Sequence, residues 1–454
     1  MRRLLLPLCL MLGACMPATP SEVATRSSQG VNSQLIQNPF PVSGGHSTRH
    51  SNSDLQRDFL DLTFELENGR ALPVFTRFEG PISVRLEGRI PGSLSTDLNR
   101  LLSRFRNEAG LDIFFTKAET ANIHIHAVPS AEIRATLPQA ACFVVPNVTS
   151  LAEFRLKRRT SATNWSSLSE RTTVSVFVPS DGTPQELRDC LHEEFAQSLG
   201  PLNDLYRLPF SVFNDDNVHT VLTSYDMLIL RAIYSDELRS GMTRAEVAKR
   251  LPAIFARINP VGNSVPATQL GKTHRQWKAY ISKALGGATT NSERFQAAQS
   301  AVNFANQAGW RDHRLGFSYY VLARLMQLHD SGNAEQMFMM SDAIFRQNRY
   351  TGLHSAYVAT QLASYAIADG RGEDALIMLA PHIDNAYKFE NASLLATLMF
   401  LRAEATEMTG RVNEARTIRL DSLAWARYGF GSDTNMNTKL REIHALNPLK
   451  RNDG

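Results

Sequence analysis

The sequence predicts an α+β protein in which a mixed domain of strands and helices precedes an all-helical domain. Two patterns lead to this expectation. Between residues 54 and 250, short apolar or alternating runs typical of strands are interspersed with segments of helical spacing. From residue 290 to residue 454, apolar side chains follow helical spacing alone. The composition, with 43% hydrophobic and 20% charged residues, is ordinary for a globular chain of two or three domains.

The first 15 residues have the three parts of a bacterial lipoprotein signal peptide. Arg2 and Arg3 supply positive charge, and residues 4–12 form an apolar run too short to span a bilayer. Small residues precede Cys15, as a cleavage site before an acylated cysteine requires. We therefore expect residues 1–15 to act as a signal and Cys15 to carry the lipid anchor, palmitate included. An ordinary secretory signal with a chance cysteine is the alternative.

Residues 16–53 are rich in Ser, Thr, Pro, Asn and Gly, so we expect a flexible tether between membrane and fold. Met16 stands where an aspartate would favour the inner membrane, so we expect an outer-membrane location that faces the periplasm. No later window is apolar enough to cross a membrane. The net charge of +4 is small and scattered, which argues against a nucleic-acid partner.

Two cysteines remain once the signal and the anchor are set aside, namely Cys142 and Cys190. In an oxidising periplasm, two remaining cysteines favour a disulfide. Because Cys142 lies in an apolar run, two separate buried thiols are the alternative.

The mixed domain over residues 54–250 is expected to alternate strands with helices. Ile82, Val84 and Leu86 alternate with polar residues, as in a half-buried strand. Leucines at helical spacing predict a helix over residues 97–109. Further strands are expected over 62–67, 121–128 and 173–179, and further helices over 184–199 and 223–234.

The helical domain over residues 290–454 is expected to follow a connector over residues 251–289. Gly370 and Gly410 each stand in a turn phrase between two predicted helices, and Gly332 belongs to a weaker third copy. Their spacing of about 40 residues resembles a lengthened tetratricopeptide (TPR) repeat. The resemblance implies a small solenoid with a concave face, and an irregular helical bundle is the alternative.

The segment from Cys190 to Asp204 carries the candidate chemistry. His192 and the following glutamate suggest a zinc-peptidase helix, but the second histidine that this motif needs is replaced by Ala196. A frame shifted by one residue fits the metzincin pattern His-Glu-x-x-His-x-x-Gly-x-x-His-Asp better. The residues in that frame are Glu193, Glu194, Gln197, Gly200, Asn203 and Asp204.

This frame resembles a degenerate metzincin site. The resemblance implies that Glu194 is the candidate general base, that Gly200 makes the turn and that Asp204 supports it. The three histidine ligand positions are occupied instead by Glu193, Gln197 and Asn203.

Residues downstream of the motif extend the resemblance. Phe213 stands where metzincins place the methionine of their methionine turn, and Tyr234 ends a helix that resembles the closing helix of such domains. The same phrases, over roughly residues 55–245, resemble a family of proteobacterial lipoproteins known as domain of unknown function 2927. That family implies a fold class and no established activity.

The ligand chemistry argues against a metal cofactor. Amide oxygens are weak zinc ligands, so we expect no cofactor and disfavour zinc or another divalent cation, although the clustered carboxylates would attract one. His192 points to a different helix face, and His124 and His126 share one face of a predicted strand, where we expect a structural role. His219 is the best candidate from outside the motif.

The altered motif favours a pseudo-peptidase, which is a non-hydrolytic scaffold that binds envelope proteins or peptides. Two alternatives stay open. One is a metal-dependent peptidase or peptidoglycan hydrolase with unusual ligands and Glu194 as general base. The other is a structural assembly lipoprotein that acts through its helical repeats.

Overall fold

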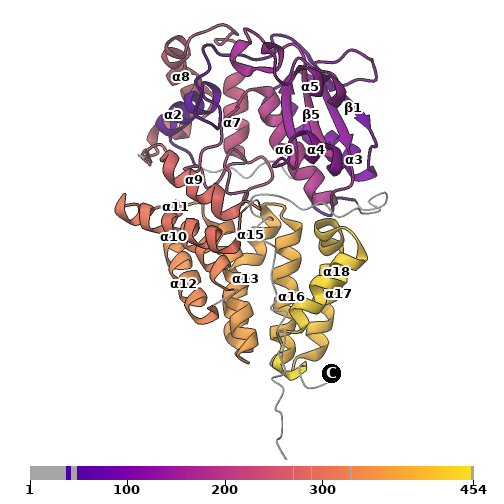
Figure 1. Ribbon diagram of the computed structural model, residues 1–454, viewed down its shortest axis with the longest axis vertical. Helices are drawn as coiled ribbons and strands as arrows, with labels where there is room; N and C mark the ends of the chain where they lie inside the picture. Colours follow the sequence, from indigo (N-terminus) through magenta and orange to yellow (C-terminus); the bar gives the residue numbers. More distant parts are fainter. Residues whose placement is uncertain (1–36, 42–48, 269, 288, 328–329, 451–454) are drawn as a thin grey trace, which may run out of the picture.

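The structure, a computed structural model, describes residues 37–41, 49–268, 270–287, 289–327 and 330–450. It confirms the predicted fold class, because a five-stranded mixed sheet with helices forms the N-terminal part and a long run of helices follows (Figure 1). The predicted signal peptide, Cys15 and most of the predicted tether lie outside the described residues.

The sheet has the strand order β2-β1-β3-β5-β4. Strands β2, β1, β3 and β5 run parallel, and β4 pairs antiparallel with β5 at one edge. Strand β5 is buried along its whole length, as expected for a strand covered on both faces. The strands are β1 (Ile82–Gly88), β2 (Ile113–Phe115), β3 (Ile123–Val128), β4 (Phe143–Pro146) and β5 (Val174–Pro179).

Helices cover both faces of this sheet. On one face, α3 (Gly92–Glu108), α6 (Pro184–Leu199) and α7 (Ser224–Ile233) share the main apolar core with the strands. On the other face, α4 (Ser130–Thr136) and α5 (Leu151–Lys157) enclose a smaller apolar cluster. The sheet therefore has one face toward the motif helix α6 and one face away from it.

The strand predicted over residues 62–67 is wrong, because helix α2 occupies Asn52–Thr63. Leu55, Phe59 and Leu62 follow the spacing of one helix face, and all three are fully buried. This helical pattern is longer than the short alternation that predicted a strand, and it buries more apolar surface.

The predicted connector over residues 251–289 is largely helical. Helix α8 (Arg244–Ile258) continues through Pro252, and α9 (Arg275–Leu285) packs on the helices that follow. Trp277 of α9 is fully buried among them. The helical array therefore begins with α9, ahead of residue 290.

The helical array contains paired helices joined by short turns. Gly370 and Gly410 stand between helices with φ near +80°, a backbone conformation that favours glycine. Gly332 instead lies in the first turn of α12, so the weaker third turn phrase does not form the same turn. The helices are α10 (Asn291–Gln307), α11 (His313–Met326), α12 (Ser331–Gln347), α13 (Gly352–Ala368), α14 (Gly372–Leu379), α15 (Ile383–Lys388), α16 (Ala392–Met408), α17 (Val412–Phe430) and α18 (Asp433–His444).

The segment predicted as a flexible tether is packed near its C-terminal end. Phe40 is 2% exposed, and its ring centroid lies 4.7 Å from that of Trp425 in α17. The Asn38 side-chain amide donates to Asp97 of α3 at 3.0 Å. The predicted tether up to residue 53 is therefore wrong near its C-terminal end, because burial of one large aromatic side chain holds this polar segment against the fold.

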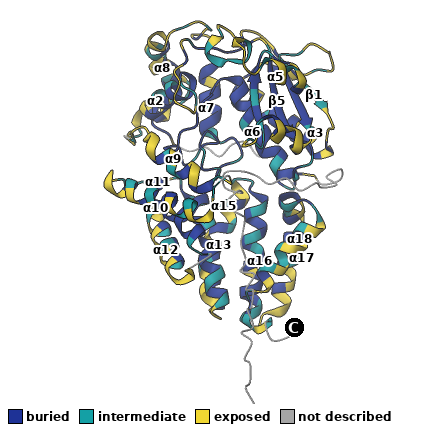
Figure 2. Cartoon of the chain, in the orientation of Figure 1, coloured by how far each residue is buried: buried dark blue, intermediate teal, exposed yellow. Residues whose placement is uncertain are grey.

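Buried polar contacts join the two parts, and buried residues extend through both (Figure 2). The Tyr428 hydroxyl of α17 donates to Asp97 of α3 at 2.8 Å. The side chain of Gln185 in α6 donates to Asn391 at 3.1 Å and accepts from the Ser393 backbone at 2.8 Å. Within the described residues, no helix is long and apolar enough to span a bilayer.

Truncation of Phe40 tests whether this N-terminal segment is part of the fold. We expect Phe40→Ala to lower the free energy of unfolding by about 3 kcal/mol, because it removes a buried ring between α17 and the mixed domain. Urea unfolding of the full-length chain measures the change. The control Leu420→Ala removes a side chain that is 61% exposed, and we expect it to change stability by less than about 0.5 kcal/mol.

Candidate functional site

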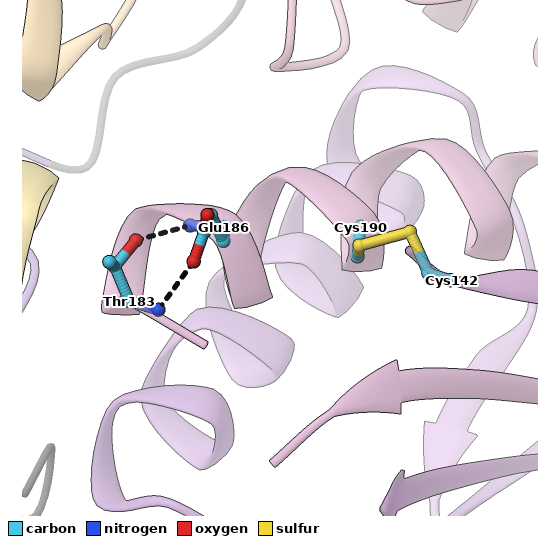
Figure 3. The surroundings of a disulfide bond; sticks show 4 residues. All are labelled: Cys142, Thr183, Glu186 and Cys190. Atoms are coloured by element: carbon cyan, nitrogen blue, oxygen red, sulfur yellow. Dashed lines mark hydrogen bonds between the residues drawn. A yellow bond between two sulfur atoms is a disulfide. The ribbon is translucent and has the colours of Figure 1, made fainter. Parts of the chain in front are cut away.

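Helix α6 begins with a strong local signal. Thr183 is its N-cap, and Thr183 Oγ1 accepts from the Glu186 backbone N–H at 3.1 Å. The Glu186 carboxylate accepts from the Thr183 backbone N–H at 2.7 Å, which completes a capping box (Figure 3). Pro184 occupies the first helical position, where no backbone donor is needed. The motif helix thus starts at a residue fixed by local sequence.

A disulfide ties α6 to the sheet. Cys190 in α6 is bonded to Cys142, which immediately precedes β4 (Figure 3). The cross-link closes 48 residues of chain and anchors the edge strand against the motif helix.

The C-terminal end of α6 is held by a buried arginine. Arg171 is 2% exposed, and its guanidinium donates to the carbonyls of Gln197, Ser198 and Gly200, each at 2.7 Å. The Tyr234 hydroxyl donates to the Leu199 carbonyl at 3.0 Å. The Gln197 carbonyl also accepts from the Gly200 backbone N–H at 3.2 Å, and the cation suits the negative end of the helix dipole. Burial lowers the pKa of Arg171 to about 10, which still leaves it charged at neutral pH.

The chain turns sharply after α6. A Cβ atom at Gly200 would lie 2.4 Å from Cδ1 of Ile233, so α7 leaves no room for a side chain there. The Asn203 side-chain amide then donates to the backbone carbonyl of Asp61 at 2.9 Å. Asn203 is therefore directed toward α2.

A buried ion pair fixes the loop that follows. The Arg207 guanidinium contacts Asp58 and Asp61 of α2 at 2.6 to 2.8 Å, and all three side chains are at most 3% exposed. The Tyr225 hydroxyl donates to Asp58 at 2.9 Å. These contacts hold residues 201–223 against α2 and α7.

Phe213 belongs to this loop, and its side chain is fully buried in the main core. Ser211 donates to the Asp226 carboxylate of α7 at 2.5 Å, and the same carboxylate accepts from the Thr223 backbone at 2.7 Å. Burial raises the pKa of Asp226 to about 6, although these donors oppose the rise. The turn that contains Phe213 is thus fixed to the start of α7.

The helical array contacts the same loop from the other side. The His313 ring lies 2.6 Å from the Tyr206 carbonyl, and the His354 ring lies 2.9 Å from the Asp216 carboxylate. Lys278 of α9 donates to the Asp204 carbonyl at 3.2 Å. Helices remote in sequence therefore position the residues around the motif.

These elements surround a cavity of about 630 Å³. It lies between α6, the segment that leads into β4 and the loops on either side of the motif. Four residues of the predicted frame line it, whereas Asn203 does not. The lining includes Glu67, Asn68, Pro138, Gln139, Ala141, Cys142, Phe143, Val144, Trp165, Glu193, Glu194, Gln197, Leu202, Asp204, Asp215 and Asn217.

The surroundings of the candidate general base Glu194 favour its protonated form. Its side chain is buried in the cavity wall. Burial, followed by the charges of Glu193 and Glu67, raises the pKa of Glu194 well above its ordinary value. Such a carboxyl group donates hydrogen bonds more readily than it accepts protons.

Three further carboxylates meet at the cavity. Glu67, Asp204 and Asp215 place carboxylate oxygens within 4.8 Å of one another. Burial and the charge of Glu67 raise the pKa of Asp204 well above its ordinary value. Burial and Glu67 raise the pKa of Asp215 to about 7, with Lys278 opposing the rise. The cavity therefore gains negative charge as the pH passes through 7.

The residues at the metzincin ligand positions do not fit a zinc ion. Gln197 donates to the Asp204 carboxylate at 3.4 Å, and the Asn203 amide is engaged with the Asp61 carbonyl. The three positions supply one carboxylate and two amides, and one of the amides is turned toward another helix. Zinc prefers imidazole and thiolate ligands that converge on one point.

The histidines outside the frame do not line the cavity. His192 accepts from the Leu222 backbone N–H at 3.2 Å, and burial lowers its pKa well below the ordinary value. His219 is buried beside Phe389, and burial lowers its pKa to about 3. His124 and His126 lie in β3, on the sheet face away from α6.

Sequence reasoning missed four residues that shape the site, namely Glu67, Trp165, Arg171 and Asp215. Asp215 ends the phrase Ser-Val-Phe-Asn-Asp (residues 211–215), which belongs to the resemblance, so its type and place were visible although no role was assigned to it. The other three come from segments far from the motif, and no local pattern marks them.

Comparison with known proteins places the whole cavity in one family segment. Residues 52–253 match the model of a family described as a protein of unknown function (DUF2927). The match confirms the predicted resemblance to domain of unknown function 2927, and it assigns no activity. The helical array beyond residue 253 lies outside the match. No curated protein and no solved structure matches the chain.

Removal of the Arg171 guanidinium tests its role at the end of α6. We expect Arg171→Leu to lower the free energy of unfolding by about 3 kcal/mol, since three buried carbonyls lose a donor. Urea unfolding measures this loss. In the control Arg159→Leu, an exposed side chain is replaced, and a comparable loss there would contradict the specific role of Arg171.

The raised pKa of Asp215 predicts a pH-dependent stability. Between pH 4 and pH 7 the folded chain keeps a proton at Asp215 that the unfolded chain loses, so this group lowers stability as the pH rises. We expect Asp215→Asn to be more stable than the wild type at pH 8 by roughly 2 kcal/mol, and equal to it near pH 4. Unfolding at both pH values measures the difference, with the exposed Asp236→Asn as control.

Proposed function

We propose that the chain is a non-hydrolytic binding protein in which a cleft resembling that of a metzincin peptidase holds a cationic segment of an envelope protein or peptide. The single observation that carries this proposal is the acidic cavity of about 630 Å³ beside the motif helix. The family match supports only the assignment to a domain of unknown function. The chemistry of the cavity supports the proposed binding of a cationic segment.

The charge of the cavity favours a cationic ligand. Glu67, Glu193 and Asp215 lie in its lining together with the buried Glu194 and Asp204. Burial, followed by the charge of Glu67, raises the pKa of Asp215 to about 7, so an ionised carboxylate is costly in this cavity. A lysine or arginine side chain offsets that cost, and Trp165 in the wall offers a ring for its alkyl stem.

The edge strand supports a polypeptide as the ligand. Strand β4 is at the end of the described sheet and pairs only with β5 there. Phe143 and Val144 of β4 also line the cavity. An extended peptide can pair with an edge strand and place one side chain in the adjacent pocket. Backbone pairing gives affinity, and the acidic pocket gives selectivity.

The residues at the ligand positions support a non-hydrolytic role. Without three converging imidazoles, water bound at the site would keep a high pKa and remain a poor nucleophile. Burial and the neighbouring carboxylates raise the pKa of Glu194 well above its ordinary value, which disfavours the ionised form that a general base needs. We therefore assign Glu194 a binding role as a hydrogen-bond donor.

We also propose that the chain is lipid-anchored through Cys15 at the outer membrane and faces the periplasm. The disulfide between Cys142 and Cys190 supports this location, since structural disulfides persist in oxidising compartments.

One observation favours a second candidate function. A buried carboxyl group with a raised pKa, such as Glu194, is also what a general acid in a hydrolase needs. A metal-dependent peptidase or peptidoglycan hydrolase with unusual ligands is therefore the alternative proposal. A reaction that Glu194→Gln abolishes would favour it.

Peptide titration tests the binding proposal. We expect extended peptides with a central lysine to bind the full-length chain roughly tenfold more tightly than the same peptides with a central glutamate. We expect the affinity for the lysine peptide to rise from pH 6 to pH 8, because Asp215 ionises around pH 7. Calorimetry measures both effects.

Two variants sharpen this experiment. We expect Asp215→Asn to lower the affinity for the lysine peptide and to reduce the dependence of this affinity on pH. The control Glu119→Gln, at an exposed side chain, should change neither. Equal affinity for the two peptides would contradict the binding proposal. Mass spectrometry of the peptides after incubation reports cleavage, which would contradict the non-hydrolytic assignment.

A further inference from the structure

A second polar cluster lies on the sheet face away from the acidic cavity. In the parallel register of β1 and β3, Glu87 stands opposite His126, and His124 is two residues earlier on the same face. The His124 and His126 rings are nearly parallel, with centroids 6.0 Å apart, and both side chains are less than 10% exposed.

Each ring has Nε2 near a carbonyl or hydroxyl oxygen and Nδ1 toward Glu87. Nε2 of His124 lies 3.1 Å from the Ala121 carbonyl, and a carbonyl oxygen can only accept. Nε2 of His126 lies 3.3 Å from Ser175 Oγ. The Ser175 hydroxyl hydrogen is already donated to the Val148 carbonyl at 2.6 Å, so Oγ accepts from His126. A neutral His126 ring therefore carries its proton on Nε2 and presents the lone pair of Nδ1, whereas both nitrogens of His124 face oxygen acceptors.

The Nδ1 atoms of both rings face one carboxylate. Nδ1 of His124 lies 2.9 Å from Oε1 of Glu87, and Nδ1 of His126 lies 3.8 Å from Oε2. In a neutral His126 ring the second contact joins two acceptors, and a metal ion there would turn this repulsion into attraction while replacing any proton shared between His124 and Glu87. Metal-binding histidines characteristically donate their other ring N–H to a carbonyl or another acceptor, as both rings do here.

The spacing of the three side chains suits a tetrahedral ion. One ligand atom from each of Glu87, His124 and His126 lies within 4.8 Å of the others. With metal–ligand bonds of about 2.0–2.2 Å, tetrahedral ligand atoms stand about 3.4 Å apart. The two nitrogen–oxygen distances, 2.9 and 3.8 Å, lie on either side of that value. Small movements of the Glu87 carboxylate would equalise them.

We propose that Glu87, His124 and His126 bind a divalent transition-metal ion of the zinc class. Two imidazoles and one carboxylate are a ligand set that zinc favours over calcium or magnesium. The Glu87 side chain is 27% exposed and gives the ion a route from solvent, with the fourth position left for water. The site is separate from the acidic cavity, whose three carboxylates suit harder cations.

Arg85 sets the strength of this site. Its Nε lies 2.8 Å from Oε1 of Glu87, while its terminal nitrogen donates to the carbonyls of Lys117 and Ala118. The guanidinium orients the carboxylate, and its charge also opposes a nearby cation. We expect Arg85→Met to bind zinc more tightly than the wild type does.

Zinc titration of the metal-free full-length chain tests the proposal, with a chromophoric chelator as competitor. We expect one zinc ion per chain, with affinity lowered more than about 100-fold in His126→Gln and about tenfold in Ser175→Ala, where the proton of His126 is no longer directed. Cobalt substitution should give the intense visible absorption of a tetrahedral ion, and His126→Gln should lose it.

Asp215→Asn in the acidic cavity is the matched control, and it should leave zinc affinity unchanged. Thermal unfolding without metal verifies that each variant is folded, and added zinc should raise the midpoint of the wild type but not that of His126→Gln. No zinc binding by the wild type, binding retained in folded His126→Gln, or binding lost in Asp215→Asn would overturn the proposal. Peptide binding at the acidic cavity stays intact in His126→Gln, so this test is independent of the proposed function.

Discussion

The guanidinium of Arg171 is the contact on which the geometry of the cavity depends. It donates hydrogen bonds to three carbonyls at the end of α6, and the Tyr234 hydroxyl donates to a fourth. Helix ends that are buried need such donors, because no water can reach their carbonyls. With that end fixed, the turn at Gly200 can deliver Asp204 to the cavity wall while Asn203 points away.

The helical array contributes to the site as a support. Lys278, His313 and His354 contact the loop that follows α6, although they lie far beyond it in the sequence. The packed segment around Phe40 and the contacts of Gln185 extend this junction to the start of α6. Within the described residues, the cavity loop and the helical array are therefore joined by buried contacts.

The two sheet faces carry opposite ligand chemistries. On the face of α6, carboxylates concentrate negative charge and raise one another's pKa, which suits a cationic side chain. On the other face, ring nitrogens held by hydrogen bonds to backbone and hydroxyl groups converge on Glu87. Imidazole and carboxylate differ in the ions they prefer, so one sheet can present two selective sites.

The sequence by itself determined the fold class, the ends of α6 and the residue types around the motif. These features rest on local chemistry: the capping residues Thr183 and Glu186, the turn at Gly200 and the spacing of apolar side chains. Only the tertiary structure decided that Asn203 faces α2 and that Glu67 and Asp215 complete the cavity. Those outcomes depend on contacts between segments distant in the chain, which no local pattern encodes.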